Sequence, residues 1–159
     1  MHKHNNIKGK GKEYYDDDIL IFEGDYLNGK RNGKGKEYNW IDGNLKFEGE
    51  YLNNHKNGKG KEYDNGKLKF EGEYLYNYKI KGKYFINRML EFEGEYRYNR
   101  KWNGKGYDKS GNVIYELING NGNVKEYNDF DDLIFEGEYK NGKIKNDCCD
   151  IIWNLKHLK

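Results

Sequence analysis

The residue types that most often perform nucleophilic catalysis are scarce in this chain of 159 residues. Its one serine, Ser110, lies in the sequence Asp-Lys-Ser-Gly, which is typical of a turn and places no base beside the hydroxyl. Cys148 and Cys149 are adjacent, and neither a histidine nor a basic cluster surrounds them. For this pair the sequence favours burial over redox or nucleophilic chemistry. We therefore expect no catalytic residue and no enzyme activity.

Metal and cofactor chemistry is equally poorly supported. The four histidines are scattered without the paired spacing of metal ligands, and only His2 and His4, near the chain start, lie close together. The run of aspartates at 16–18 lacks the glycine and the distal glutamate of a calcium loop, which favours a polar loop. Gly33 and Gly35 neither follow a buried apolar strand nor open a helix, so they do not form a phosphate loop. We expect no metal, no cofactor and no small-molecule substrate.

Carboxylates and lysines are abundant, and their pattern is repetitive. A pair such as Glu48 and Glu50 could serve acid–base chemistry on a glycoside. Equivalent pairs recur along the chain, whereas an active site is built once, so repetition indicates a structural or multivalent role. Lysines among tyrosines also suggest single-stranded nucleic acid. The net charge of +2 shows that acids balance the bases, which disfavours that partner.

The elements that carry these charges are internal repeats. The pattern Leu-x-Phe-x-Gly-x-Tyr places apolar residues on one face of an extended strand and charged residues on the other. This period of two predicts a strand, because a helix would scatter the apolar residues. Five clean copies start at Leu20, Leu45, Leu68, Leu90 and Leu133, with a worn copy at Val113-x-Tyr115-x-Leu117.

A turn and a second strand follow each copy. Asn28-Gly29 precedes a strand that begins at Asn32 and contains Gly-Lys-Gly-Lys-Glu-Tyr, and the same strand sequence recurs at 58–63. Asn-Gly supplies the positive φ angles of a tight hairpin turn. Lysines of the second strand, such as Lys59 and Lys61, oppose acids of the first strand and should bias the register. Each unit is thus a β-hairpin of about 23 residues.

The two ends of the array differ from its middle. Residues 9–14 form a second strand without its first, so the array opens on a half unit. We assign residues 1–146 to the repeat array and 147–159 to a capping segment. Apolar residues at 151, 152, 155 and 158 have helical spacing, which predicts a short helix that covers the last sheet edge.

The unit Phe-Glu-Gly-Asp-Tyr-Leu-Asn-Gly-Lys-Arg-Asn-Gly-Lys-Gly at 22–35 resembles the MORN repeat, the membrane occupation and recognition nexus. The resemblance covers roughly Ile7 to Lys145 and leans toward a bacterial, antitoxin-like variant of the repeat. One departure is that Glu37 and Glu62 take an aromatic place while Tyr38 and Tyr63 follow one residue later. Those tyrosines should therefore face the other side, or a bulge should intervene.

The resemblance implies an all-β protein: an elongated, single-layer antiparallel sheet of about six successive hairpins. It also implies a protein-interaction, dimerisation or localisation module. Since a one-layer sheet leaves apolar surface exposed, we expect its aromatic face to bind a protein partner or a second copy. The candidate binding residues on that face are Phe22, Tyr26, Phe47, Tyr51, Phe70, Tyr74, Phe92, Tyr96, Phe135 and Tyr139.

The alternative is a phospholipid-binding module at a membrane surface. The family resemblance implies it, and the C-terminal segment could lie in an interface. The candidate membrane residues are Ile151, Ile152, Trp153, Leu155 and Lys156. No apolar run resembles a secretory signal or a membrane span, so we expect a cytoplasmic protein. The alternative location is peripheral, at a membrane or a cytoskeletal structure.

Overall fold

The computed structural model describes residues 7–16, 18–128, 130 and 132–145. These residues form thirteen strands in two sheets. The strands are β1 (Lys8–Tyr15), β2 (Ile19–Leu27), β3 (Lys30–Tyr38), β4 (Leu45–Leu52), β5 (His55–Asp64), β6 (Lys67–Leu75), β7 (Tyr78–Ile86), β8 (Met89–Arg97), β9 (Arg100–Tyr107), β10 (Val113–Leu117), β11 (Gly122–Tyr127), β12 (Leu133–Lys140) and β13 (Lys143–Ile144).

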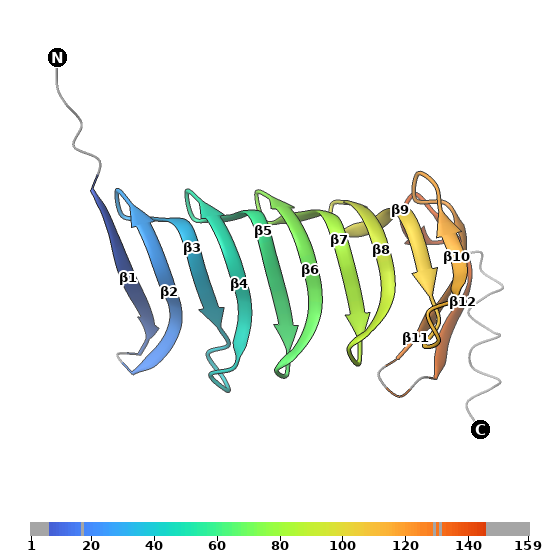
Figure 1. The fold of residues 1–159 in the computed structure, drawn as a ribbon, viewed down its shortest axis with the longest axis horizontal. Helices are drawn as coiled ribbons and strands as arrows, with labels where there is room; N and C mark the ends of the chain where they lie inside the picture. Colours follow the sequence, from blue (N-terminus) through green and yellow to red (C-terminus); the bar gives the residue numbers. More distant parts are fainter. Residues whose placement is uncertain (1–6, 17, 129, 131, 146–159) are drawn as a thin grey trace, which may run out of the picture.

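Strands follow one another across the sheet in the order of the sequence. The first sheet runs from β1 to β10, with every neighbouring pair antiparallel, and Figure 1 shows it as an open row along the long axis. This confirms the all-β prediction of an elongated open sheet of successive hairpins. The half unit is also confirmed, because β1 lies at the edge and pairs with β2 alone among the described residues. The predicted capping helix at 147–159 falls outside the described residues.

The hairpin turns have the backbone that the sequence predicts. Asn28 and Gly29 both have positive φ, at 51° and 76°. The next turn keeps this geometry although Asn54 replaces the glycine, with φ of 72°. Asparagine tolerates this left-handed region better than most residues with a side chain. The register of the flanking strands is therefore fixed by the turn.

A register shift accompanies the displaced tyrosines. It falls between Glu37 and Tyr38 and between Glu62 and Tyr63, at the end of each second strand. Beyond the shift, the Tyr38 hydroxyl donates to Glu23 at 2.8 Å and the Tyr63 hydroxyl to Glu48 at 2.7 Å. Both expectations from the sequence are met: an irregularity intervenes, and these tyrosines reach carboxylates of the charged face.

Glycines oppose one another across nine successive strands. The pairs run from Gly11 opposite Gly24 in β1 and β2 to Gly94 opposite Gly104 in β8 and β9. A β-carbon on Gly49 would lie 2.7 Å from the Cα of Gly60, so a side chain there would collide with the next strand. The column therefore lets neighbouring backbones approach closely where the aromatic rings lie.

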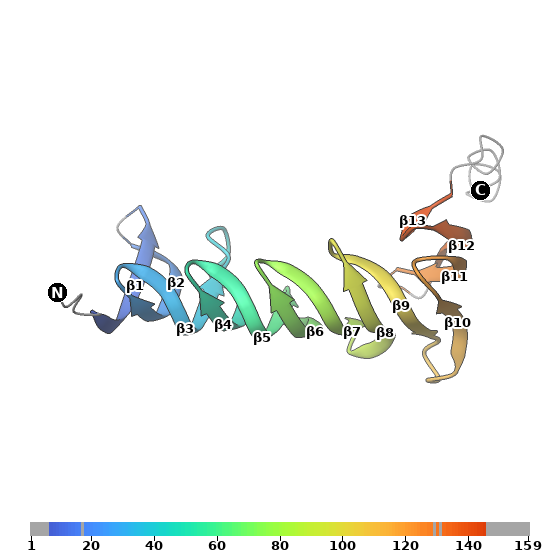
Figure 2. The same cartoon turned by 90° about the horizontal axis from the view of Figure 1, so that it is seen from above.

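The glycine column ends in the worn unit. Leu117 takes the place of the repeat glycine, opposite Gly104. A side chain there occupies space that the following strand uses in other units. β11 accordingly does not continue the first sheet but opens a second one, β11-β12-β13, which Figure 2 shows turned out of the row at one end. Leu117 and Val124 of β11 are both buried at this junction.

Candidate functional site

The candidate aromatic residues form the core of the molecule rather than an open surface. Phe22, Phe47, Phe70 and Phe92 are 0% exposed. The following tyrosine in three of these units is also buried: Tyr51, Tyr74 and Tyr96. Only Tyr26, Phe135 and Tyr139 are partly buried, and they belong to the units at the ends of the array. The expectation that this face offers exposed rings to a partner is therefore wrong for the seven buried residues.

The rings of consecutive units enclose one another. The Phe47 ring meets Tyr51 of its own strand and Tyr74 of the next unit edge-on, at centroid distances of 5.6 and 5.3 Å. Such pairs contribute about 0.5–1.5 kcal/mol beyond burial. The Lys56 ammonium lies 4.1 Å from the Phe47 centroid, and Gly60 lies beneath the ring. A one-layer sheet thereby buries its aromatic residues because neighbours, a cation and bare glycine cover each ring.

Repeating ion pairs lie over this aromatic core. Arg31 pairs with Glu13 at 2.6 Å, Lys56 with Glu37 at 3.3 Å and Lys79 with Glu62 at 2.7 Å. Each cation lies over a phenylalanine of its own unit, and each carboxylate comes from the unit before. The Arg31 hydrogen bond holds the pKa of Glu13 below its usual value. These contacts join units, which is a structural role.

The last ion pair of this series is the most buried. Lys101 lies 2.8 Å from Glu91 and 3.3 Å from Glu126, and the Tyr115 hydroxyl donates to Glu91 at 2.9 Å. Burial, reinforced by the nearby Glu91 carboxylate, raises the pKa of Tyr115 well above its usual value. Because Lys101 continues the row of Arg31, Lys56 and Lys79, this cluster closes the junction between the two sheets.

The opposite, charged face of the sheet holds a large hollow. It is an open groove of about 1090 Å³ that crosses β1 to β8. Seven glycines of the column line it, together with eight lysines and seven carboxylates from the same strands. The missing side chain of each glycine would point to the aromatic face, where a β-carbon on Gly24 or Gly49 would meet a phenylalanine ring. On the groove face these positions present backbone, and the charged side chains of the residues before and after each glycine stand on either side.

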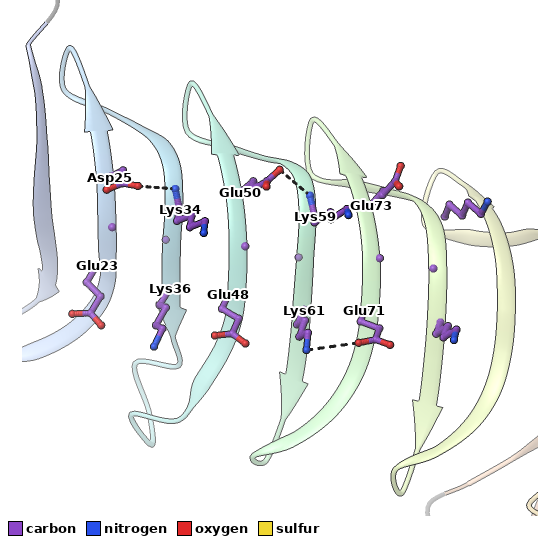
Figure 3. Close-up of a pocket in the computed structure, with 18 of the residues that line it drawn as sticks. Glu23, Asp25, Lys34, Lys36, Glu48, Glu50, Lys59, Lys61, Glu71 and Glu73 are labelled. Atoms are coloured by element: carbon purple, nitrogen blue, oxygen red, sulfur yellow. Dashed lines mark hydrogen bonds and ion pairs between the residues drawn. The ribbon is translucent and has the colours of Figure 1, made fainter.

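The charges of the groove are ordered by strand. Figure 3 shows two rows along the groove, one with Asp25, Lys34, Glu50, Lys59 and Glu73 and one with Glu23, Lys36, Glu48, Lys61 and Glu71. The sign alternates along each row, and both rows carry the same sign on any one strand. The groove is therefore crossed by stripes of alternating charge. Neighbouring strands lie about 4.8 Å apart, so a stripe of the same sign returns every ~10 Å.

The side chains of the groove are held in place by few direct contacts. Lys61 lies 3.8 Å from Glu71 and Lys83 lies 3.8 Å from Glu93. The carboxylates of Asp25 and Glu50 accept from the backbone amides of Lys34 and Lys59 at 2.9 and 3.1 Å. The ammonium groups are thus presented in the groove, where long, loose ion pairs leave them open to exchange partners.

The other residues singled out from the sequence lie apart from one another. Ser110 lies in the predicted turn, where its amide donates to Asp108. His55 contacts Asn77 at a hairpin end. No three histidine, cysteine or carboxylate residues of the described ranges are grouped to hold a metal ion. His2, His4, both cysteines and all five candidate membrane residues fall outside those ranges, so the structure leaves their roles as predictions. The described part has no helix long and apolar enough to cross a bilayer.

Sequence reasoning did not single out several aromatic residues that are exposed. Tyr76, Tyr78 and Tyr98 are 57%, 48% and 68% exposed and lie at the hairpin ends. Tyr76 and Tyr98 have φ of 47° and 52°, in turn positions that other units give to asparagine. An aromatic residue at a turn position is the signal that would have separated these rings from those of the core.

The sequence matches no protein-family model and no curated protein. The groove and the repeat geometry therefore carry the functional argument.

Proposed function

We propose that this protein is a non-enzymatic scaffold that binds an extended polypeptide segment in the charged groove. The single observation that carries the proposal is the order of the groove: stripes of alternating charge over a glycine floor across β1 to β8. The face differs from the one expected from the sequence, because the aromatic rings are used to join the units. The resemblance to the MORN repeat stays a prediction that agrees with a binding role.

The spacing of the stripes selects the shape of the partner. A polyproline II segment advances about 3.1 Å per residue and has three residues per turn, so every third side chain returns to one face after ~9.3 Å. This matches the ~10 Å repeat of like charge given by two strands. A β-strand places same-face side chains about 6.7 Å apart, which does not match. The partner should therefore be extended, with charge repeating every three residues.

The length of the groove and the alternation of its charges set two further properties of the partner. Eight strands span about 34 Å, enough for roughly 11 residues in this conformation. Because lysines and carboxylates alternate, their fields cancel at a distance, so the groove should select register at contact rather than attract a partner of one sign. This favours a segment that carries both charges, and it disfavours nucleic acid and an anionic membrane surface as occupants of this groove.

The test uses three synthetic 12-residue peptides of equal composition, labelled with a fluorophore and titrated with the full-length protein. The first peptide has the repeat Lys-Gly-Glu and should bind. The other two have the same residues in an alternating and in a scrambled order. They should bind at least about tenfold more weakly, a difference of about 1.4 kcal/mol. Equal binding of all three peptides, or of none, would contradict the proposal.

A matched pair of variants locates the site. K59E/K61E makes three neighbouring strands acidic within the groove and should abolish the preference for the ordered peptide. K30E/R88E makes the same change in net charge at exposed residues outside the groove and should leave it intact. Loss of binding in both variants would show that the peptide responds to net charge, not to the groove.

A further inference from the structure

The two long edges of the first sheet differ in charge. Because consecutive strands are antiparallel, the turns after β2, β4, β6 and β8 all lie at one edge, the upper edge in Figure 1. We call these turns, residues 27–30, 52–55, 75–78 and 97–100, the basic edge. They contain no aspartate or glutamate, and their exposed basic side chains are Lys30, His55, Arg97 and Arg100. The turns of the opposite edge include the exposed residues Asp16, Asp18, Asp42 and Asp64.

The balance of charge over the whole chain hides this local excess. Within the described part of the chain, Lys30, Arg97 and Arg100 form no ion pair with a carboxylate. A strand of nine residues is about 30 Å long, so the aspartates of the opposite edge lie well beyond the ~8 Å over which physiological salt screens a charge. The net charge of +2 therefore does not describe the charge at the basic edge.

Two tyrosines of the basic edge occupy a backbone position that disfavours them. Tyr76 and Tyr98 stand first in their turns, with φ of 47° and 52°. Asn28 and Asn53 hold the same place in the preceding turns, with φ of 51° and 49°. Left-handed backbone is unfavourable for a bulky side chain, whereas asparagine adopts it more readily. Both tyrosines are mostly exposed, so they add little to the core. A strained residue whose ring is left in solvent indicates a use in binding.

The exposed rings of the basic edge form a contact that repeats. The imidazole of His55 meets the ring of Tyr76 in the next turn edge-on, at a centroid distance of 5.8 Å. Tyr78 meets Tyr98 of the following turn in the same way, at 5.9 Å. The Arg97 guanidinium lies 5.8 Å from the centroid of the Tyr98 ring. Because the two ring pairs belong to successive hairpins, they lie about 10 Å apart, with cations beside them.

We propose that the basic edge binds single-stranded nucleic acid, with bases stacked on the tyrosine rings and phosphates held by Lys30, Arg97 and Arg100. Aromatic rings that stack on bases and cations that follow the backbone are the two parts of such a site. Bases in a duplex follow one another at about 3.4 Å, so rings ~10 Å apart can hold bases only of a strand that is unstacked. The rings accept any base, so the site should have little sequence preference.

Fluorescence anisotropy of a labelled oligothymidylate with the full-length protein tests the stacking contacts. Y76N/Y98N removes two rings without a change in net charge and gives both turns the asparagine of the other units, so the fold should persist. Affinity should fall at least about tenfold, because two bases lose their stacking partners. Y14N/Y15N is the matched control, since it removes two exposed tyrosines at the other end of β1 and should leave the affinity unchanged. Thermal unfolding followed by circular dichroism checks that both variants are folded.

Salt dependence tests the phosphate contacts separately. For a single strand, the logarithm of the affinity falls with the logarithm of the salt concentration by about 0.7 for each phosphate contact, so R97Q/R100Q should make this slope shallower by about 1.4. K67Q/R88Q removes two exposed cations from the opposite edge and should leave the slope unchanged. Y76N/Y98N should lower the affinity and keep the slope, because stacking releases no counterions.

Three results would overturn the inference. The first is that oligothymidylate does not bind even at low salt. The second is that a duplex of the same length binds as tightly as the single strand. The third is that polyphosphate, which has no bases, binds as tightly as the oligonucleotide while Y76N/Y98N has no effect, which would indicate a general anion-binding surface such as one for a membrane. The ordered peptide of the groove should not displace the oligonucleotide, so the failure of either proposal leaves the other standing.

Discussion

At the residue scale, glycine is the most constrained position of the repeat. Its absence of a side chain makes room on the aromatic face, where a phenylalanine ring lies over it, and its backbone forms part of the groove floor on the other face. Where leucine takes its place, at Leu117, the regular sheet ends. The missing side chain is therefore needed for the aromatic core and for the close approach of neighbouring strands.

Gly49→Ala should destabilise the fold by about 1–3 kcal/mol, the usual cost of inserting atoms into a packed interior. Its β-carbon would lie 2.7 Å from both the Cα of Gly60 and the carbonyl oxygen of Lys59, and backbone cannot move aside easily. Gly9→Ala is the matched control, because nothing lies within 4 Å of its β-carbon. Urea unfolding at neutral pH compares the two free energies of unfolding. Equal changes in the free energy of unfolding for the two variants would refute the close approach of strands at Gly49.

At the element scale, adjacent hairpins are joined at their turns. The side-chain oxygens of Asn54, Asn77 and Asn99 accept from the backbone amides of Arg31, Lys56 and Lys79, each in the preceding unit, at 2.7–2.8 Å. The backbone amide of Asn54 also donates to the Arg31 carbonyl at 3.0 Å. The turn residue thus serves two purposes: it takes positive φ within its own hairpin and bonds to the hairpin before it.

Asn54→Gly separates these two purposes. Glycine accepts φ of 72° without strain, so the turn should persist while the bond to Arg31 is lost. Asn53→Gly changes the neighbouring turn residue, whose φ is 49° and whose side chain makes no such bond to the preceding unit. We expect Asn54→Gly to be less stable than Asn53→Gly by about 1 kcal/mol, the net value of one hydrogen bond. Thermal unfolding checks the difference. If Asn54→Gly proved more stable than Asn53→Gly, the turn asparagine would not be a link between units.

At the scale of the whole molecule, the tyrosines make stability dependent on alkaline pH. Burial, together with a hydrogen bond to a carboxylate, raises the pKa of Tyr26, Tyr38 and Tyr63 to about 12 from 10. The pKa values of Tyr51, Tyr74, Tyr96 and Tyr139 are raised for the same main reason, burial. These residues are spread over the entire array, so their effects add across units.

The direction of this pH dependence follows from proton binding. Above pH 10 the unfolded chain loses phenolic protons that the folded protein keeps, so stability falls with rising pH. The contribution of Tyr38 and Tyr63 is complete below pH 10 and disappears as pH passes through about 12. Urea midpoints measured from pH 8 to 12 should therefore fall, and Y38F/Y63F should fall less steeply. An unchanged slope in that variant would show that the two phenols titrate alike in both states.

The sequence by itself determined the repeat, its hairpins and their order. The period-two pattern of Phe70, Gly72 and Tyr74 and the Asn-Gly turns are local signals, and local signals fix strands and turns without reference to distant residues. The opposition of Glu48 and Lys61 was predictable for the same reason, because turn length sets register. The half unit at β1 also followed from counting strands.

Only the tertiary structure decided which face is available for binding. The sequence places Phe47 and Tyr51 on one face but does not say whether other units cover them, and the neighbouring Tyr74 and Lys56 do. The groove likewise exists because charged side chains from many strands align across the sheet, which depends on the sum of all registers. Only the structure likewise shows that Tyr26 and Phe135 are less buried than their equivalents, since burial depends on neighbours that lie far away in the chain.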